Sequence, residues 1–345
     1  MKALMLKAYG QLEVQDVPPP GVGPRDVLVR VMACGICGSD VHGMDGSTGR
    51  RIPPIVMGHE AAGLVERVGA HVTSFAAGDR VTFDSTIYNP ESFFSRRGLV
   101  NLCDDRRVLG VSCEDYRQDG AFAELVAVPS HILYSLPPGM TFEQAAMVEP
   151  VSIAVHARNL TPIEGGDTAL VFGTGLIGLM MVQVLRQTAV ARMVAVDVDD
   201  GRLALAAELG ADHVLNSAAA DVAAAVRALT EGRGADVAFE AVGLEATVRA
   251  AVLAVRKGGS VTLIGNLAKD VSLPLQAVVT RQIRLQGSCA SNGEYPECLE
   301  LIASGKVNVD RFISAIAPLE EGPRWFDRLH RREPGLLKVL LKPNP

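Results

Sequence analysis

The sequence has no excess of basic residues. Its 345 residues include 33 Lys and Arg against 39 Asp and Glu, which gives a formal net charge of −6 at pH 7. Proteins that bind nucleic acids usually carry a basic face that neutralises phosphates, so we expect no nucleic-acid partner. Hydrophobic residues make up 48% of the chain and charged residues 21%, as in ordinary soluble globular proteins. The length predicts about two domains.

A disulfide framework and a targeting signal are also missing. The six cysteines, at positions 34, 37, 103, 113, 289 and 298, follow no framework pattern, so we expect reduced thiols or ligands. The N-terminal residues MKALMLKAYG contain neither a long apolar core nor a small-residue cleavage site, and therefore show no signal peptide. We predict a cytoplasmic protein.

One uncharged run approaches the length of a membrane span. It covers eighteen residues from Thr168 to Leu185, TALVFGTGLIGLMMVQVL, whereas a membrane-spanning helix needs about 20. Three glycines, at positions 173, 175 and 178, divide it into a β-rich piece and a helical piece. A strand that leads into a helix accounts for this pattern better, so we predict no membrane partner.

The chain has two kinds of organisation. Residues 1 to about 150 contain short β-segments such as DVLVRVMA, GLVERVGA and FAELVAV, separated by turn residues and clustered prolines. From about 151, apolar strands such as TALVFG, MVAVDV, DVAFEAV and SVTLIG alternate with amphipathic helices, which predicts a parallel sheet with βαβ crossovers. After about 290 the character is mixed again, and the chain ends in LLKVLL, a predicted strand that rejoins the first domain.

A glycine-rich turn lies between the first strand and the first helix of the alternating region. The residues FGTGLIGL contain Gly173-x-Gly175-x-x-Gly178. Alone, this spacing indicates only a tight strand-to-helix turn. With Asp197 nineteen residues beyond Gly178, at the end of the next predicted strand, it predicts a dinucleotide site. The helix N-terminus would stabilise the pyrophosphate, and Asp197 would accept from the ribose hydroxyls and repel a 2′-phosphate, which favours NAD over NADP.

Arg202 admits two interpretations at this site. It can be taken for a residue that binds the 2′-phosphate of NADP. We instead expect it to pack along the adenine or to pair with an acidic residue on the helix over 199–208.

The first domain contains candidate metal ligands in CGICGSDVHG and GHEAAG. Cys37, His59 and Glu60, together with Glu149 in VEP at the domain junction, offer donors that suit zinc. A zinc ion is a Lewis acid that promotes ionisation of an alcohol, and a nicotinamide accepts hydride from an alcohol carbon only when that happens. The plainer explanation is that Cys34 and Cys37 form a CxxC pair and that His59 is a hydrogen-bonded interior histidine.

Together, these motifs resemble those of the zinc-containing medium-chain dehydrogenases, in the branch of the sorbitol, galactitol-phosphate and threonine dehydrogenases. The resemblance covers essentially the whole chain, with CGICGSDVH at 34–42, GHE at 58–60, GDRV at 78–81, VEP at 148–150 and the nucleotide fingerprint. It implies an α/β protein. A GroES-like, mainly-β catalytic domain would cover 1–150, completed by 290–345, and a Rossmann domain with a doubly wound parallel sheet would cover 151–289.

The resemblance also implies roles for individual residues. Cys37, His59 and Glu149 become zinc ligands, and Glu60 either ligates zinc or exchanges with water or substrate. Ser39 would take the proton of the alcohol, His42 would pass it toward solvent, and Asp40 would orient the His59 ring. Cys34 matches no ligand position and is expected in the core. The implied NAD contacts are Gly173, Gly175, Leu176, Ile177, Gly178, Asp197, Arg202, Val242, Ile264, Gly265, Ser288, Cys289 and Ala290.

Many members of the resembled family hold a second, structural zinc with four cysteines spaced C-x2-C-x2-C-x7-C. The corresponding residues here are Asn89, Ser92, Ser95 and Cys103. One thiolate cannot hold a closed tetrahedral site, so we predict one catalytic zinc per chain and no structural zinc. Phe93 and Phe94 are expected to anchor this lobe by burial, in a subunit contact or in a simple core.

We therefore predict an NAD- and zinc-dependent dehydrogenase that oxidises a secondary alcohol of a polyol or sugar-derived substrate to a ketone, as a homodimer or homotetramer. The alternatives are an amino-alcohol dehydrogenase of threonine type and a sugar-phosphate alcohol dehydrogenase. A binding protein without catalysis and a zinc-free quinone reductase are disfavoured, because Ser39, His42 and all candidate ligands are retained.

The candidate ligand set also predicts a substrate preference. A metal held by one thiolate, one imidazole and carboxylate accepts further oxygen ligands, which favours vicinal diols over monoalcohols. The resembled sorbitol dehydrogenases place an arginine where this chain has Ala290. We therefore expect contacts to the polyol hydroxyls, if any are retained, from Arg50 or Arg51.

Overall fold

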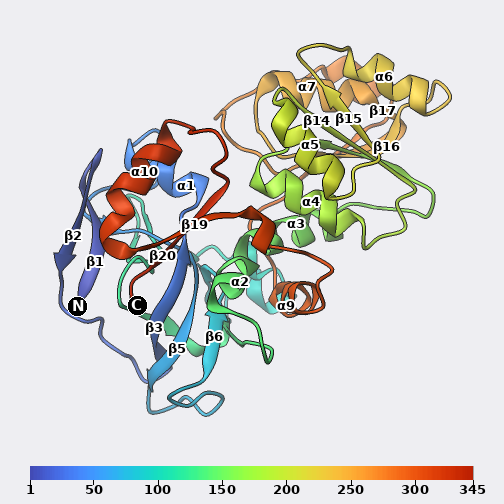
Figure 1. Ribbon diagram of the computed structural model, residues 1–345. Helices are drawn as coiled ribbons and strands as arrows, with labels where there is room; N and C mark the ends of the chain where they lie inside the picture. Colours follow the sequence, from blue (N-terminus) through green and yellow to red (C-terminus); the bar gives the residue numbers. More distant parts are fainter. Residues whose placement is uncertain (345) are drawn as a thin grey trace. The chain divides into compact units, whose positions relative to one another are not determined.

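The computed structural model describes residues 1–344, which form two compact units. Unit 1 consists of Met1–Glu149 and the described residues from Ser291 onward, and unit 2 consists of Pro150–Ala290. Strands β1 and β20, which lie near the two ends of the chain, both belong to unit 1 (Figure 1). The helix α3 (Val148–Leu160) begins at the end of unit 1 and continues into unit 2.

Unit 1 is mainly β-structure. Its largest sheet has seven strands in the order β12-β6-β5-β3-β20-β19, with β11 paired to β3. The strands of unit 1 are β1 (Lys2–Ala8), β2 (Gln11–Asp16), β3 (Asp26–Gly35), β4 (Ile55–Val56), β5 (Glu60–Val68), β6 (Arg80–Phe83), β7 (Thr86–Ile87), β8 (Arg107–Val108), β9 (Val111–Ser112), β10 (Arg117–Gln118), β11 (Leu125–Pro129), β12 (Leu133–Ser135), β19 (Ile313–Pro318) and β20 (Lys338–Lys342). Its helices are α1 (Gly38–Met44), α2 (Phe142–Ala146), α9 (Tyr295–Ala303) and α10 (Gly322–His330).

The last strand of the chain completes the sheet formed by the first 150 residues. In β20, Leu340 pairs with Gly35 and Leu341 with Cys34 of β3, in antiparallel register. The prediction that LLKVLL forms a strand that rejoins the first domain is confirmed. The pairing also takes Lys338 into the interior, where its exposed fraction is 1%. Cys34 is fully buried, as expected for a core residue.

Unit 2 is an α/β layer structure around a sheet of six parallel strands. The order β15-β14-β13-β16-β17-β18 corresponds to 3-2-1-4-5-6 in the order of the unit's own strands, the doubly wound Rossmann arrangement. The strands are β13 (Thr168–Phe172), β14 (Arg192–Asp197), β15 (His213–Asn216), β16 (Ala235–Glu240), β17 (Val255–Leu263) and β18 (Arg284–Gly287). The helices are α4 (Leu176–Leu185), α5 (Asp200–Glu208), α6 (Val222–Leu229), α7 (Glu245–Ala254) and α8 (Leu275–Thr280). The predicted parallel sheet is confirmed.

The uncharged run Thr168–Leu185 forms β13, the glycine turn and α4, as predicted. Both elements are buried, because the strand is central in the sheet and the helix packs against it. None of the helices formed by residues 1–344 combines the length and the apolar character that crossing a bilayer requires.

Candidate metal and cofactor sites

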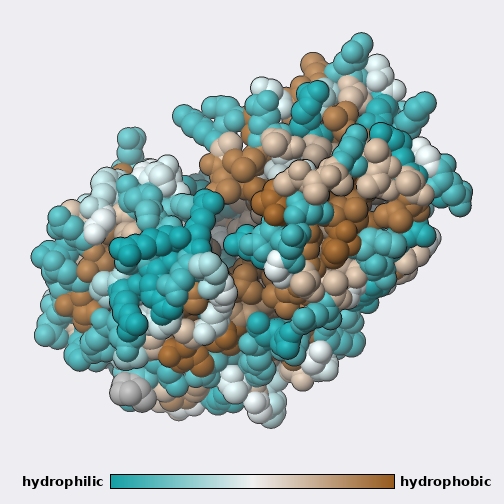
Figure 2. All heavy atoms as spheres, turned by 45° about the horizontal axis from the view of Figure 1, so that its top comes forward, coloured by the Kyte–Doolittle hydropathy of each residue, from teal (hydrophilic) through white to brown (hydrophobic). Residues whose placement is uncertain are grey.

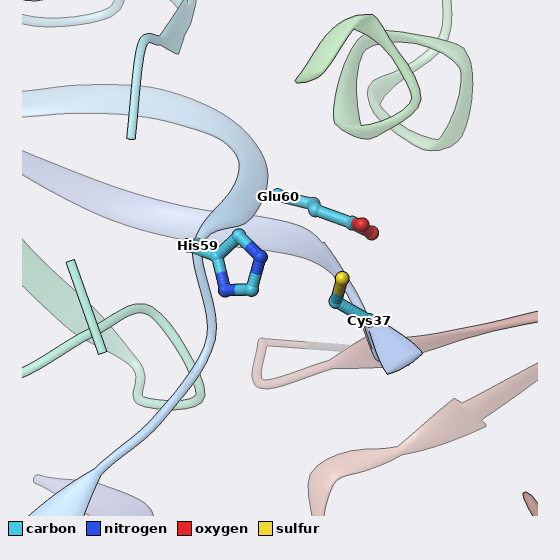
Figure 3. A group of neighbouring side chains, drawn as sticks. All are labelled: Cys37, His59 and Glu60. Atoms are coloured by element: carbon cyan, nitrogen blue, oxygen red, sulfur yellow. The ribbon is translucent and has the colours of Figure 1, made fainter. Parts of the chain in front are cut away.

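Three of the four predicted metal ligands lie together in unit 1. Cys37 follows β3 as the N-cap of α1, and His59 directly precedes Glu60, the first residue of β5. Because Gly35 pairs with Glu60 across β3 and β5, the end of one strand brings its cysteine beside the start of the other. One ligand atom from each of Cys37, His59 and Glu60 lies within 4.8 Å of the others. Figure 3 shows that the sulfur, the imidazole and the carboxylate face a common space.

The packing around Glu60 requires a glycine on the neighbouring strand. A Cβ atom at Gly35 would lie 2.2 Å from Oε2 of Glu60 and would displace this carboxylate from its pairing with Lys338. The CGIC sequence therefore owes its glycine to the carboxylate beside it, and not to a turn.

A buried carboxylate lies behind the His59 ring. Oδ1 of Asp40 lies 3.4 Å from Nδ1 of His59, and Oδ2 accepts a hydrogen bond from the backbone N–H of Cys37 at 3.3 Å. Arg51 donates to the same Oδ1 at 3.0 Å. Burial raises the pKa of the Asp40 carboxyl, but His59 and Arg51 outweigh burial and hold that pKa well below its usual range. The predicted pairing of Asp40 with the His59 ring is therefore present.

Sequence reasoning missed a second buried cation, Lys338. Its Nζ lies 2.5 Å from Oε2 of Glu60 and donates to the backbone carbonyl of Ile36 at 3.0 Å. Burial lowers the pKa of Lys338, but Glu60 and Cys37 outweigh burial and raise it. An isolated buried charge is costly, so this lysine and Glu60 stabilise each other as a pair. The signal that could have found it is a single lysine in the otherwise apolar run LLKVLL.

Glu149 lies outside the three-residue group. It is in the first turn of α3, and its Oε1 accepts from the hydroxyl of Ser85 at 3.5 Å. Burial, together with the charges of Glu60 and Asp84, raises the pKa of Glu149 to about 7. The charge of His59 acts in the opposite direction and lowers this pKa, so Glu149 lies near the group without being one of its three members.

The donor set fits a zinc ion. Sulfur, imidazole nitrogen and carboxylate oxygen are all ligand types that zinc accepts in four-coordinate sites. Nδ1 of His59 is buried and makes no well-aligned hydrogen bond, although Asp40 lies beside it. Ligation of zinc through the other ring nitrogen would fix a proton on Nδ1 and so give the Asp40 carboxylate a donor, as in carboxylate–histidine–zinc arrangements. Within residues 1–344, this is the only such group of three or more potential metal ligands.

The two predicted relay residues lie on α1. Ser39 and His42 are three positions apart, which places both on one face of the helix. The Ser39 hydroxyl accepts a hydrogen bond from Nη2 of Arg51 at 3.3 Å. Arg51 is only 4% exposed and is bound to Asp40. The expectation that Arg50 or Arg51 contacts substrate hydroxyls stays a prediction.

The glycine turn of unit 2 has the geometry that its spacing predicts. Gly173 has φ +86°, in the left-handed region that favours glycine. A Cβ atom at Gly178 would lie 1.7 Å from the carbonyl oxygen of Gly173, so α4 approaches β13 as closely as only glycine permits. Gly175 is the N-cap of α4, and Leu176 and Ile177 are its first residues, so free N–H groups point out of this end of the helix.

Asp197 has a structural role that sequence reasoning missed. It is the last residue of β14, and its Oδ2 accepts from the backbone N–H of Thr174 at 2.6 Å and from its hydroxyl at 3.0 Å. Oδ1 accepts from the backbone N–H groups of Val198 and Asp199 at 2.7 and 3.1 Å. The carboxylate thus ties the glycine turn to the neighbouring strand.

The remaining predicted cofactor residues follow β16, β17 and β18, the half of the sheet on the other side of β13 from β14. Ile264 and Gly265 follow β17 and both donate to the carbonyl of Glu240, the last residue of β16. The Glu240 side chain accepts in turn from the backbone N–H of Val242. Ser288 follows β18 and donates to Leu263, and Cys289 and Ala290 come next, the latter with φ +53°. The predicted residues after β13, β14, β16, β17 and β18 therefore lie at the carboxyl edge of one parallel sheet, where dinucleotides bind.

Arg202 lies in the first turn of α5 with an exposed side chain. Its backbone N–H donates to Oδ1 of Asp199, the N-cap of that helix, at 3.0 Å.

The lobe that contains Asn89, Ser92, Ser95 and Cys103 is organised by hydrogen bonds. The sulfur of Cys103 accepts from the backbone N–H of Asn89 at 3.4 Å, and the hydroxyls of Ser92 and Ser95 bond to each other at 2.9 Å. Phe93 is 54% exposed, with the Arg97 guanidinium 3.5 Å from its ring centre. The expectation that Phe93 anchors the lobe in a simple core is therefore wrong.

Comparison with known proteins identifies the family. Residues 23–138 match the alcohol dehydrogenase GroES-like domain, and residues 177–304 match the zinc-binding dehydrogenase family. The chain is 30% identical to a sorbitol dehydrogenase of Bacillus subtilis (strain 168), over 100% of this chain and 98% of that protein. It is 36% identical to an L-idonate 5-dehydrogenase of Vitis vinifera, over 90% of this chain and 86% of that protein.

A solved structure gives the same result. A protein of Sinorhizobium meliloti 1021 that was crystallised with NADP is 32% identical, has a TM-score of 0.89 and covers 99% of each chain. The predicted fold, the dehydrogenase activity and the requirement for a nicotinamide dinucleotide and zinc are confirmed at the level of the family. With its GroES-like domain, its Rossmann domain and its group of Cys37, His59 and Glu60, this chain belongs to the zinc-dependent medium-chain alcohol dehydrogenases, in the branch that includes the polyol dehydrogenases.

Proposed function

We propose that this protein oxidises a secondary alcohol of a polyol or sugar-derived substrate to a ketone, with NAD as hydride acceptor. The observation that carries the proposal is the group of Cys37, His59 and Glu60, in which His59 and Glu60 are buried and Cys37 is half-buried. Lys338 pairs with Glu60, and Arg51 pairs with Asp40 behind His59. Similarity to a sorbitol dehydrogenase over 100% of this chain, and to an L-idonate 5-dehydrogenase over 90% of it, supports the class of substrate.

In this proposal Cys37, His59 and Glu60 hold the zinc ion, with Glu149 as the further carboxylate close to it. When bound, zinc supplies a Lewis acid that lowers the pKa of the substrate alcohol. Ser39 takes the hydroxyl proton, His42 passes it toward solvent, and the hydride leaves the alcohol carbon for C4 of the nicotinamide. Asp40 keeps the His59 ring in one orientation, and Lys338 keeps the Glu60 carboxylate in place.

NAD is proposed over NADP because Asp197 ends β14 at the position where the adenosine ribose binds. A carboxylate there repels a 2′-phosphate. The Asp197→Asn variant removes the charge and keeps an oxygen that can accept from Thr174. We expect the ratio of kcat/KM for NAD to that for NADP to fall about tenfold or more in this variant. Equal use of both cofactors by the unmodified enzyme would contradict the assignment.

The substrate class is tested with a panel of vicinal diols, sugar phosphates, amino alcohols and monoalcohols, assayed by NADH absorbance. We expect polyols with adjacent hydroxyls to give the highest kcat/KM, and ethanol and 2-propanol to be much poorer. An amino alcohol such as threonine, or a sugar phosphate, as the best substrate would favour the corresponding alternative. A monoalcohol that equals every diol would exclude the polyol class.

We also propose a homodimer or homotetramer in the cytoplasm. Apolar side chains reach the surface of the protein in several places (Figure 2). In unit 2 they include Leu267, Leu275 and Val279, which are 55%, 66% and 68% exposed and lie on or near α8. Light scattering after gel filtration tests the oligomer, and replacing Leu275 and Val279 with glutamate is expected to weaken it if this surface is covered by a second copy.

The proposed location is the cytoplasm. A ligand thiolate at Cys37 suits a reducing compartment, and fractionation of cells tests the location.

A further inference from the structure

Near the proposed metal ligands, the buried guanidinium of Arg51 has no function assigned above. Its Nη2 donates both to Oδ1 of Asp40 at 3.0 Å and to the hydroxyl of Ser39 at 3.3 Å. Its Nη1 donates to the backbone carbonyl of Arg50 at 3.0 Å, and its Nε is buried without a partner. One nitrogen thus joins the carboxylate behind His59 to the hydroxyl proposed to accept the substrate proton.

We propose that Arg51 is a positioning residue for Ser39, an inference that rests on the dehydrogenase function proposed above. A serine hydroxyl has one donor and two acceptor positions. The N–H of Arg51 takes one acceptor position and therefore turns the O–H of Ser39 away from the guanidinium. The other acceptor position stays open for the alcohol proton, and the O–H is directed to pass a proton onward.

Arg51 does not itself carry the proton. A guanidinium stays protonated in proteins, so it donates hydrogen bonds without releasing a proton, and it has no lone pair that could receive one. In the reaction, the alcohol proton moves to Oγ of Ser39 while Ser39 gives its own proton to the next acceptor. The hydride, with its electron pair, moves from the alcohol carbon to C4 of the nicotinamide. The protonation state of Arg51 is the same before and after the proton and hydride transfers.

The position of Arg51 is also electrostatically suited to this role. Hydrogen bonds from a charged donor are about twice as strong as neutral ones, and this one lies where negative charge grows on Oγ as its proton leaves. The ion pair with Asp40, in which the two side chains are 5% and 0% exposed, prevents the guanidinium from turning out into solvent. Asp40 thus fixes two groups, the His59 ring and the cation beside Ser39.

A glycine on α1 makes room for this arrangement. A Cβ atom at Gly43 would lie 2.2 Å from Cγ of Arg51 and 3.1 Å from its Cβ. The stem of Arg51 therefore packs against the helix that carries Ser39, Asp40 and His42. Since Gly43 has no left-handed φ, alanine fits its backbone and acts only by displacing the arginine.

The test is a double-mutant cycle between Arg51→Lys and Ser39→Ala. Lysine keeps a positive charge beside Asp40 but is a point charge without the planar fork, so it does not reproduce the contact to Ser39. We expect kcat to fall about tenfold in Arg51→Lys and about 100-fold in Ser39→Ala. Zinc content and the KM for NAD are expected to stay unchanged in both. The double variant is expected to match Ser39→Ala alone, because Arg51 acts through that hydroxyl.

The possible outcomes separate the two proposals. If the losses in kcat multiply in the double variant, Arg51 acts independently of Ser39 and the inference is wrong, while the proposed function stands. If Ser39→Ala turns over like the unmodified enzyme, both the relay and the role of Arg51 are wrong. If Arg51→Lys loses zinc in proportion to activity, Arg51 serves the metal site alone, which also overturns the inference.

A second variant disturbs the contact between Arg51 and Ser39 without altering any polar group. Gly43→Ala pushes the stem of Arg51 away, so we expect a fall in kcat in the same range as for Arg51→Lys, and no further fall in the Ser39→Ala background. Gly38→Ala, on the same helix but with no atom within 4 Å of the added Cβ, is the matched control and is expected to keep its turnover. A Gly43→Ala enzyme with unchanged kcat would contradict the proposed positioning.

Discussion

Two regions of unit 1 present residues in positions where zinc-dependent dehydrogenases hold metal, and they differ in how their polar atoms are satisfied. The group of Cys37, His59 and Glu60 is bordered by buried charges, with Lys338 on Glu60 and Asp40 behind His59. The lobe over residues 89–103 is neutral at the corresponding positions, and its thiol, hydroxyls and backbone N–H groups bond to one another. The first region has buried charge and an imidazole N–H in need of an aligned acceptor. The second satisfies its polar groups with one another and with a side chain from a distant segment, Asn292.

The comparison shows what the loss of metal ligands requires of a fold. Removing three thiolates from a closed site leaves a loop whose backbone groups still need partners. Here Ser92 caps the backbone N–H of Ser95 at 3.2 Å, and Asn292 accepts from the N–H of Val100 at 2.8 Å. Short polar side chains therefore cross-link this lobe through hydrogen bonds.

The largest effect that distinguishes the two regions is expected from Cys37→Ser. The substitution replaces a thiolate ligand with a hydroxyl, which is a poor zinc ligand at neutral pH. We expect zinc content to fall from about one to near zero per chain, and kcat/KM to fall at least 1000-fold. Elemental analysis measures the zinc content, and NADH absorbance measures kcat/KM. A Cys37→Ser protein that keeps both its zinc and its turnover would show that the metal lies elsewhere.

The next largest effect is expected on stability, from Lys338→Met. Removing one partner of a buried ion pair leaves the Glu60 carboxylate uncompensated, which costs about 3–5 kcal/mol in the free energy of unfolding. The loss is expected to be largest in protein treated with a chelator, since zinc compensates the same carboxylate. Urea titration measures it, and Glu60→Gln in the same chain is expected to restore part of the stability.

The matched control for Lys338→Met is Lys2→Met. Lys2 pairs with Glu320 at 2.6 Å, but both side chains are about half exposed, at 52% and 51%. Exposed pairs contribute little, so no measurable change in stability is expected. Equal losses in the two variants would show that the Lys338 pair is not buried in solution.

The difference between the two regions can be removed by introducing cysteines into the lobe. Asn89→Cys, Ser92→Cys and Ser95→Cys, made together, give four thiols with Cys103 at the spacing of the structural zinc site. We expect zinc content to rise from about one to about two per chain and the melting temperature to rise with it, while kcat is unchanged. Unmodified protein that already holds two zinc ions per chain would contradict the account of the lobe.

Much of this architecture can be predicted from the sequence because it depends on local patterns. Gly173 and Gly178 are required by backbone geometry, and Asp197 follows from the length of a βαβ unit, so their positions can be counted along the chain. The pairing of Cys37 with His59 is also predictable, since both lie in motifs of a known family.

The remaining parts of the site depend on contacts between distant segments. Lys338 lies 278 residues from Glu60. The sequence predicts that LLKVLL rejoins the first domain, but nothing local predicts that its lysine meets Glu60. Arg50 or Arg51 was expected at the substrate because Ala290 stands where sorbitol dehydrogenases place an arginine, and nothing local predicts that Arg51 packs over Gly43 and pairs with Asp40. Phe93 was expected to be buried in a simple core or in a subunit contact, and in the single chain a cation covers its exposed ring.

The smallest effect is expected from Cys103→Ser, which is chemically the same change as Cys37→Ser. Cys103 is 2% exposed, and its sulfur accepts from the N–H of Asn89. Burial raises the pKa of its thiol, but hydrogen bonds from Ser92 and Asn89 outweigh burial and lower that pKa. A hydroxyl accepts the same hydrogen bonds, so we expect the free energy of unfolding to change by less than about 1 kcal/mol. Zinc content and kcat should match those of the unmodified enzyme. Because one substitution is tested in two places, loss of zinc from Cys103→Ser would mean that the lobe still binds metal, and the contrast between the two regions would disappear.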